Sequence, residues 1–187
     1  MHCVTAEQLI VCTAAFEQAG RVPALADRIE HAGVVPTGYP GVLARLGLTV
    51  VTQPGFIRAR GDAYLEHVPA AEQDWLYPCA TLLAAGVTVA GSTDAPFGPA
   101  DPWLAIAAAS TRRTASGRVL GPVERVCAGA ALRLFLADPL DPRRTRAVAA
   151  GQPADLCVLR APLAAALAAP AATVVRATLA DGRLLPA

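Results

Sequence analysis

The sequence predicts an α/β protein in which four β-α units form half of an eight-stranded (β/α)8 barrel and a small β unit follows. The first observation is that four short apolar segments alternate with segments of helical periodicity, which favours parallel pairing of the strands. Four such units are half of the number that closes a barrel. The second is a change of character after the Asp- and Pro-rich stretch 138–142, beyond which strand patterns surround the hairpin signal Asp181-Gly182.

The four strands of the barrel part are expected at residues 1–4, 28–32, 48–53 and 87–90. Thr5 and Gln8 form a capping box that starts the first helix, and Gly20 ends it. Apolar spacing and end signals predict the other helices at 36–46, 72–85, 102–112 and 122–136. Residues 56–69 show no clean period, so we expect a loop there.

The end of the chain is predicted to form a separate β unit. Its strands are expected at 154–159, 173–180 and 183–185, with an alanine-rich stretch at 162–169 between the first two. Asp155 is expected to order a turn in this unit. The predicted organisation is therefore a partial barrel at 1–145 and a small β portion at 146–187.

Composition excludes several classes of function. The net charge of +1 offers no electrostatic basis for binding nucleic acid or an anionic membrane, and no apolar run reaches transmembrane length. All 16 basic residues are arginine, which excludes a Schiff-base lysine, a phosphate-loop lysine and a carbamylated lysine ligand within this chain. The 5 cysteines contain no C-x-x-C motif, and no signal peptide is apparent, so we expect reduced thiols in a cytoplasmic protein.

The stretch GVTVAGSTDAPFGP, residues 86–99, places Asp94 directly after a short buried strand. In parallel α/β folds, ligands and catalytic groups collect at the carboxyl ends of strands. The competing interpretation is that Asp94 is a turn or helix-cap aspartate, because Asp before Pro is common in turns. The stretch by itself leaves both open.

Two histidines occupy comparable positions, since His2 and His31 lie in or at the end of predicted strands. Two imidazoles and the carboxylate of Asp94 are suitable ligands for a divalent metal such as zinc, and Asp94 could accept a proton from water. The alternatives are a disordered terminal His2 and a hydrogen-bonded core His31. His67 is interpreted as a surface or pocket residue, and Arg112 as a helix-end residue or an anion ligand.

A resemblance to a known family joins these pieces. HCVTAEQL with His2, RIEHAGVV with His31, GSTDAPFGPADP with Asp94, and the closing GQPADLCVL and ATLADGRL resemble, in order, the carboxyl-terminal part of metal-dependent amidohydrolases of the family 3 type. The resemblance implies the last four units of a TIM-like barrel, then part of a small β-sandwich. It implies hydrolysis of amide-like, non-peptide C–N bonds in a small molecule. His2, His31 and Asp94 would bind the metal, zinc, and Asp94 would move the proton.

The sequence also departs from that family. The paired H-x-H of its first strand and the lysine ligand of many members are absent. We therefore expect a truncated or split member with reduced or no activity alone, whose partner is a missing amino-terminal half or a second copy. The alternative is a non-catalytic half-barrel that acts as an interaction or oligomerisation module. A doubly wound ligand-binding sheet is disfavoured, because no Gly-rich phosphate loop follows a strand. No residue identifies the substrate.

Overall fold

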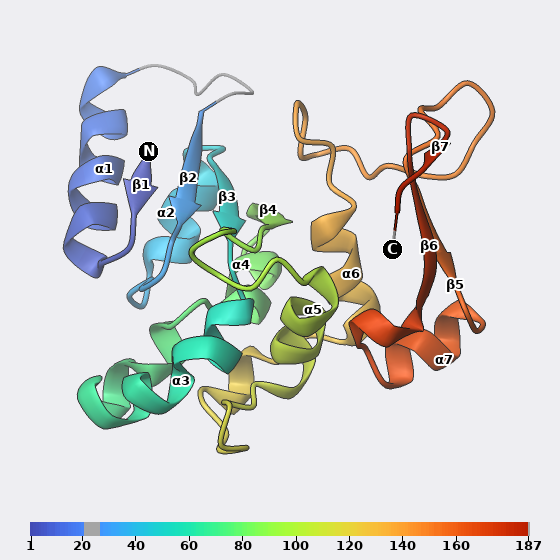
Figure 1. The fold of residues 1–187 in the computed structure, drawn as a ribbon. Helices are drawn as coiled ribbons and strands as arrows, with labels where there is room; N and C mark the ends of the chain where they lie inside the picture. Colours follow the sequence, from blue (N-terminus) through green and yellow to red (C-terminus); the bar gives the residue numbers. More distant parts are fainter. Residues whose placement is uncertain (21–26, 187) are drawn as a thin grey trace.

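The computed structural model describes residues 1–20 and 27–186; residues 21–26 of the expected barrel part and Ala187 of the β portion lie outside them. The first half of the chain builds a parallel sheet in the order β1-β2-β3-β4. Its strands are β1 (His2–Cys3), β2 (Arg28–His31), β3 (Thr49–Thr52) and β4 (Thr88–Gly91). All three pairings are parallel, as predicted, with Cys3 opposite His31 and Thr52 opposite Gly91. The carboxyl ends of the strands therefore share one edge (Figure 1).

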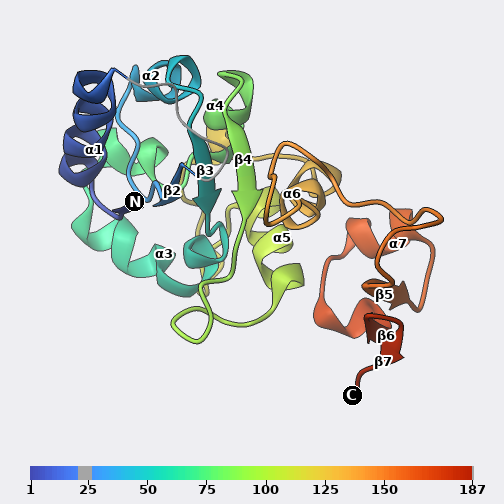
Figure 2. The ribbon, with the colours of Figure 1, turned by 90° about the horizontal axis from the view of Figure 1, so that it is seen from above.

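Helices connect successive strands of the sheet (Figure 2). They are α1 (Ala6–Ala19), α2 (Tyr39–Arg45), α3 (Gly55–His67), α4 (Cys79–Ala84), α5 (Pro102–Thr111) and α6 (Ala128–Phe135). The predicted capping box at Thr5 and Gln8 is confirmed, and Gly20 ends α1 with a φ of 62°. The parallel sheet with its helices confirms the α/β class.

A core on one side of the sheet holds these elements together. Fully buried side chains of the strands, such as Ile29 and Val50, pack against Leu9 of α1, Leu43 of α2 and Leu82 of α4. On the opposite pleat of β2, Arg28 and Glu30 stay partly exposed and form an ion pair with each other. This alternation shows which side of the sheet the helices cover.

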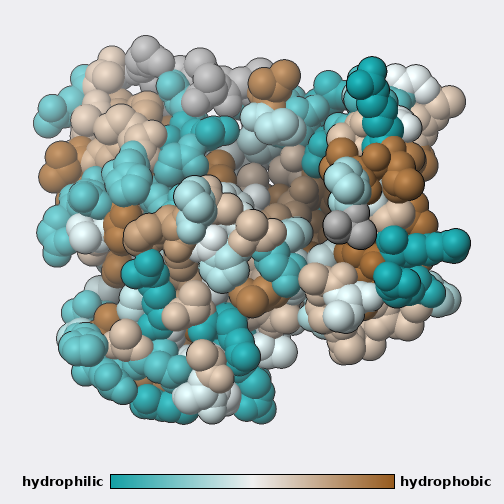
Figure 3. All heavy atoms as spheres, in the orientation of Figure 1, coloured by the Kyte–Doolittle hydropathy of each residue, from teal (hydrophilic) through white to brown (hydrophobic). Residues whose placement is uncertain are grey.

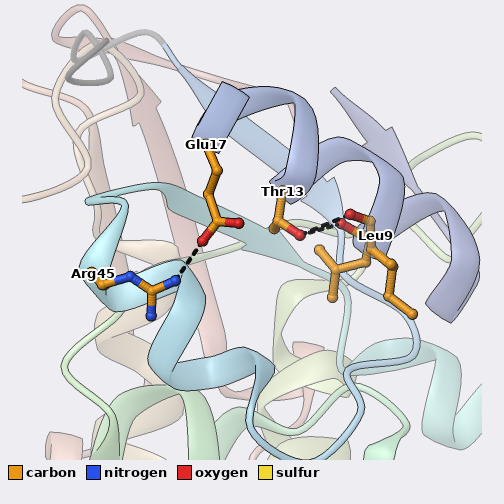
Figure 4. Close-up of polar contacts among 5 residues, drawn as sticks. Leu9, Thr13, Glu17 and Arg45 are labelled. Atoms are coloured by element: carbon orange, nitrogen blue, oxygen red, sulfur yellow. Dashed lines mark hydrogen bonds and ion pairs between the residues drawn. The ribbon is translucent and has the colours of Figure 1, made fainter. Parts of the chain in front are cut away.

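Polar contacts occur within α1 and between α1 and α2 (Figure 4). The hydroxyl of Thr13 in α1 donates to the carbonyl oxygen of Leu9 at 2.9 Å. Arg45 of α2 reaches Glu17 of α1, with 2.5 Å between Nη2 and Oε1. Because the ion pair is largely exposed, we assign it a small part of the stability.

The prediction of a loop at 56–69 is wrong, because α3 occupies Gly55–His67. Its buried stripe, Phe56, Ile57 and Gly61, follows helical spacing. Gly61 allows α3 to approach the chain at Thr114, since a Cβ there would lie 2.7 Å from the Thr114 methyl carbon. A buried glycine adds nothing to an apolar pattern, so the period was hidden in the sequence.

Two predicted helices are each divided. In place of the single helix predicted at 72–85, the chain forms the short 3-10 helix η1 (Ala70–Trp75) and then α4, because Pro78 disfavours helical backbone at Tyr77. The region 122–136 contains the 3-10 turn η2 (Pro122–Glu124) and α6. Glu124 is buried and accepts a hydrogen bond from the Thr81 backbone N–H at 2.9 Å, which holds η2 against α4.

The C-terminal unit is a three-stranded antiparallel sheet in the order β5-β6-β7. Its elements are β5 (Leu156–Leu159), α7 (Leu163–Ala168), the 3-10 turn η3 (Ala172–Val174), β6 (Val175–Ala180) and β7 (Arg183–Leu184). The hairpin at Asp181-Gly182 is confirmed, with φ values of 48° and 73°. Asp155 orders this turn, as predicted, by accepting the Asp181 N–H at 2.8 Å.

The C-terminal unit packs against the helices of the first part. Ala166 of α7 joins a buried cluster with Trp103 and Ile106 of α5 and Ala131 of α6. Figure 3 shows apolar atoms in the hollow over α6, between the parallel sheet and the C-terminal unit. None of the helices in the described residues is long and apolar enough to cross a membrane.

Candidate metal and substrate pocket

One pocket of about 410 Å³ lies at the carboxyl edge of the parallel sheet. Its lining combines two imidazoles, one carboxylate, one guanidinium and a set of aromatic rings. The lining residues are His2, Val4, His31, Phe56, Arg60, Tyr64, Tyr77, Asp94 and Phe97. We call this the histidine pocket. It contains all three residues that the sequence predicted as metal ligands.

His2 and His31 are in direct contact at one end of the histidine pocket. Their ring centroids lie 4.4 Å apart with the planes at 76°, an edge-on arrangement. The two strands are neighbours in the sheet, so the ends of β1 and β2 bring the imidazoles together. His31 is 7% exposed, whereas His2 is open to solvent on the pocket side.

Asp94 enters the pocket from the loop after β4. Its backbone N–H donates to the Ser92 hydroxyl at 3.1 Å, and its carbonyl accepts the Gly98 N–H at 2.9 Å. The interpretation of Asp94 as a helix cap is wrong, because Asp101 caps α5 through a 2.9 Å bond from the Trp103 N–H. Asp94 does lie in a turn, and within the described chain no hydrogen bond to its carboxylate is recorded, so the carboxylate is available to a ligand.

Backbone strain is concentrated around the histidine pocket. His31, Tyr77 and Asp94 all have positive φ, at 73°, 46° and 56°. A non-glycine residue in this region costs about 1–3 kcal/mol and persists only where surrounding contacts impose it. Strain at three lining residues indicates that the backbone is shaped to present these side chains.

The donor set matches a divalent metal in chemistry but not in a closed arrangement. Imidazole nitrogen and carboxylate oxygen are ligands that zinc prefers. Within residues 1–20 and 27–186, however, no group of three or more His, Cys, Asp or Glu side chains lies close enough to hold an ion. The described residues therefore place two imidazoles in contact and a carboxylate on the same pocket, which matches a metal in ligand chemistry without forming a complete site.

Two unpartnered polar atoms mark the same edge of the sheet. Thr52 Oγ1 and Gln53 Oε1 are buried and have no hydrogen-bond partner within the described chain. Thr52 is the last residue of β3 and Gln53 follows it, between the strand that ends at His31 and the strand that precedes Asp94. Buried polar atoms without partners are uncommon and call for an explanation. The sequence reasoning passed over both residues because Thr and Gln at a strand end carry no signal of their own.

Tyr77 is a pocket residue that the sequence reasoning missed. Burial raises the pKa of its phenol, and the neighbouring Tyr64 and Asp94 raise it further while Arg60 lowers it. The phenol therefore stays protonated and can donate a hydrogen bond. Its ring packs against Phe56, with 5.7 Å between centroids. Together these aromatic side chains form the apolar wall of the pocket.

Arg112 donates a hydrogen bond to the backbone of Tyr77, and its buried guanidinium is not accessible to an anion. It is 0% exposed and donates to the carbonyl oxygens of Leu76, Tyr77 and Leu120 at 2.9, 3.1 and 2.9 Å. Burial lowers the pKa of its guanidinium, an effect that Cys79 and Glu124 oppose. The helix-end interpretation holds for its backbone, which ends α5 with a φ of 55°. His67 lies outside the pocket, with Nδ1 2.8 Å from the Ala63 carbonyl oxygen.

A parallel sheet that gathers imidazoles and a carboxylate at its carboxyl edge is typical of α/β enzymes. The chain belongs to the amidohydrolase family, whose model matches residues 1–186. This confirms the resemblance seen in the sequence.

Individual relatives agree with the family. The chain is 33% identical to the N-substituted formamide deformylase of Arthrobacter pascens over 141 residues, covering 71% of this chain and 25% of that protein. An uncharacterized metal-dependent hydrolase of Pyrococcus furiosus is 32% identical, with a TM-score of 0.60 over 72% of this chain and 26% of that one. Its counterpart in Pyrococcus horikoshii OT3 is 29% identical, with a TM-score of 0.62 over 72% and 27%. The chain thus spans about a quarter of the length of these relatives.

A third solved structure, of an uncharacterized protein, shares the fold with a TM-score of 0.60 at 19% identity. It covers 98% of this chain and 44% of its own, so the likeness includes the C-terminal unit.

Proposed function

We propose that this chain contributes to the metal-dependent hydrolysis of an amide-like, non-peptide C–N bond in a small molecule. The observation that carries the proposal is the histidine pocket, which holds His2, His31 and Asp94 at the carboxyl edge of one sheet. Support comes from the amidohydrolase family match and from a relative that is a deformylase of N-substituted formamides.

In this proposal each of the three residues has a role. His2, His31 and Asp94 would hold the metal, zinc, through two ring nitrogens and one carboxylate oxygen. When bound, zinc makes water acidic near neutral pH and polarises a carbonyl group. Asp94 accepts the proton of the attacking water and returns it to the leaving nitrogen. Its carboxylate is free for this role because it makes no other hydrogen bond in the described chain. The Tyr77 phenol can donate to a substrate oxygen from the pocket wall.

The proposed architecture is the last four units of a (β/α)8 barrel at 1–145, followed by part of a β-sandwich at 146–187. Four parallel strands in sequential order and a separate antiparallel sheet support it. Only two imidazoles are in contact within the described chain, so we expect weak metal binding and little or no hydrolysis by this chain alone. Five free thiols support placing the protein in the cytoplasm.

The test is a zinc titration of the purified chain by isothermal titration calorimetry, with three variants. His31→Asn and Asp94→Asn remove the ligand while keeping a residue that tolerates positive φ. His67→Asn is the matched control, because His67 is exposed and outside the pocket. We expect one zinc site whose affinity falls at least about tenfold in His31→Asn, the loss of one strong ligand. Binding that is unchanged in His31→Asn contradicts the ligand assignment, and robust turnover by the parent contradicts the expected need for further residues.

A second candidate function is a non-catalytic interaction or oligomerisation module. It is favoured by the edge strands β1 and β4, neither of which pairs with a further strand within the described chain. Unpaired edges are templates for association. Size-exclusion chromatography with light scattering tests it: a homodimer without any zinc site would favour this candidate, and a monomer would count against self-association.

A further inference from the structure

Arg60 is the only guanidinium on the histidine pocket of the described chain, and two aromatic rings hold it there. It lies one helical turn after Phe56 on α3, with its guanidinium carbon 5.4 Å from the centroid of that ring. The same carbon is 4.3 Å from the centroid of Phe97, in the loop that also carries Asp94. The two rings are themselves in edge contact at 6.0 Å. Stacking against aromatic faces orients a planar guanidinium.

The donors of Arg60 have no acceptor among the described residues. Arg28, Arg45 and Arg146 each face a carboxylate. Arg58, on the same helix, donates to the Thr114 carbonyl oxygen at 2.7 Å. No hydrogen bond or ion pair of this kind is recorded for Arg60, whose contacts are to aromatic carbon. Arg60 is exposed and Phe97 is 67% exposed, so water meets the donors of Arg60 in the free protein, and a planar anion in the pocket can replace that water with paired N–H bonds.

The pocket places this cation beside both an apolar surface and the hydrolytic groups. Arg60, Tyr77 and Asp94 all line this one pocket. The imidazole pair occupies the same pocket of about 410 Å³, a volume within the range of small-molecule sites. A substrate that reaches the imidazoles with its amide group can therefore extend a substituent along the aromatic wall to Arg60.

We propose that Arg60 determines substrate specificity and that the substrate is an amide whose nitrogen substituent carries both an aromatic ring and a carboxylate. This inference rests on the proposed function for the identity of the amide group. The aromatic ring packs on the accessible part of the aromatic lining, which is Phe97 and the half-buried Tyr64, because Phe56 and Tyr77 are each only 3% exposed. The carboxylate accepts paired N–H bonds from the guanidinium, a geometry that a neutral substituent cannot supply.

A purely structural role is the rival explanation. Arg60 links α3 to the loop of Asp94 through Phe97, so its removal could loosen the pocket without any contact to substrate. In that case every ligand of the pocket would lose affinity equally. A comparison of charged and neutral probes separates the two explanations.

The experiment measures binding of two matched formamides to the metal-free chain by isothermal titration calorimetry. N-Formylphenylalanine and N-(2-phenylethyl)formamide differ only in the carboxylate. The protein is the full 187-residue chain, dialysed against a chelator, so that the carboxylate cannot bind a metal. The variants are Arg60→Met, which keeps the length of the side chain without its charge, and Arg60→Lys, which keeps the charge without the planar fork. Arg176→Met is the matched control, because Arg176 is exposed on β6 in the C-terminal unit.

We expect the parent and Arg176→Met to bind the carboxylate probe about fivefold more tightly than the neutral one, the upper range for an exposed ion pair. Arg60→Met should bind both equally, at the affinity of the neutral probe, and Arg60→Lys should lie between. Equal binding of both probes by the parent, no binding of either, or a preference that survives in Arg60→Met would overturn the proposal. Because no metal is present, these results are independent of whether the zinc titration supports the proposed function.

Discussion

The buried guanidinium of Arg112 holds the backbone carbonyl of Tyr77 at 3.1 Å, which ties the interior of the protein to the wall of the histidine pocket. Tyr77 itself has a φ of 46°, and the next bond from Arg112 goes to the carbonyl of Leu76. One side chain at the end of α5 thus fixes the strained segment between η1 and α4. The bond from the Tyr77 N–H to the Gly33 carbonyl oxygen, at 3.0 Å, is a second contact that imposes the strained conformation.

Replacing Arg112 with methionine should therefore destabilise the protein strongly. The change removes three hydrogen bonds, which we expect to cost about 3 kcal/mol of unfolding free energy, or about 1 kcal/mol for each bond. The Tyr77 carbonyl oxygen keeps its bond from the Cys79 N–H, whereas those of Leu76 and Leu120 lose their Arg112 partner. Urea unfolding followed by circular dichroism measures this. Arg113→Met is the control, because the exposed Arg113 makes a single bond to the Gly117 carbonyl oxygen and should change stability by less than about 0.5 kcal/mol. Similar effects of the two changes would contradict the role assigned to Arg112.

Thr52→Val should raise stability. The Thr52 hydroxyl is fully buried without a partner, so replacing it with a methyl group of the same shape should gain about 1 kcal/mol. Thr13→Val makes the same chemical change at a hydroxyl bonded to the carbonyl oxygens of Leu9 and Ile10, and should lose about 1 kcal/mol. Thermal unfolding of the two variants would show opposite shifts in Tm. A lower Tm for Thr52→Val would mean that its hydroxyl has a partner in solution.

Gly98→Ala should disturb the loop that carries Asp94. A Cβ at this position would lie 2.2 Å from the Thr93 carbonyl oxygen, so the loop must move, at a cost of roughly 1–3 kcal/mol. The Gly98 N–H also bonds to the Asp94 carbonyl, so we expect weaker binding at the histidine pocket as well as a lower Tm. Gly41→Ala is the control: a Cβ there meets nothing within 4 Å, and α2 should gain up to about 1 kcal/mol. An unchanged Tm in Gly98→Ala would argue against this loop conformation.

Asp62 should contribute to the dependence of stability on pH. Hydrogen bonds from Ser116 and Thr114 lower the pKa of its carboxyl group below the ordinary value. Because the folded state favours the ionised form, this contribution is present above the ordinary aspartate pKa and is lost as the pH falls through the lowered one. Between about pH 5 and about pH 3, the range in which carboxyl groups usually titrate, Tm should therefore fall less steeply in Asp62→Asn than in the parent.

Glu66→Gln supplies the comparison for Asp62. It removes an exposed carboxylate from the same helix, one for which no hydrogen bond is recorded, and its Tm profile should follow that of the parent. Parallel profiles for the parent and Asp62→Asn would show that the hydrogen bonds from residues 114–116 do not favour the ionised form of the Asp62 carboxyl group.

Much of the fold was readable because local signals agreed with the tertiary result. The alternation of strands and helices, the capping box at Thr5 and the hairpin at Asp181-Gly182 are each encoded within a few residues. Family membership was also readable, from His31, Asp94 and the residues around them. The interpretation of Asp94 as a helix cap rested on a local rule and was wrong, since the carboxylate that caps α5 is seven residues further on, at Asp101.

What only the tertiary structure decided depends on contacts between distant segments. The sequence by itself determined an α/β chain of the amidohydrolase type and named His2, His31 and Asp94 as the residues to examine. It could not determine that α3 is a helix, because the close approach at Gly61 is made by Thr114, far along the chain. Nor could it determine that Arg112 is buried or that Arg60 lies between two rings, because those environments are built by Leu76, Tyr77 and Phe97 from other elements. Periodicity reports a residue's own helix or strand, whereas burial and charge pairing report neighbours that only folding brings within a few ångströms.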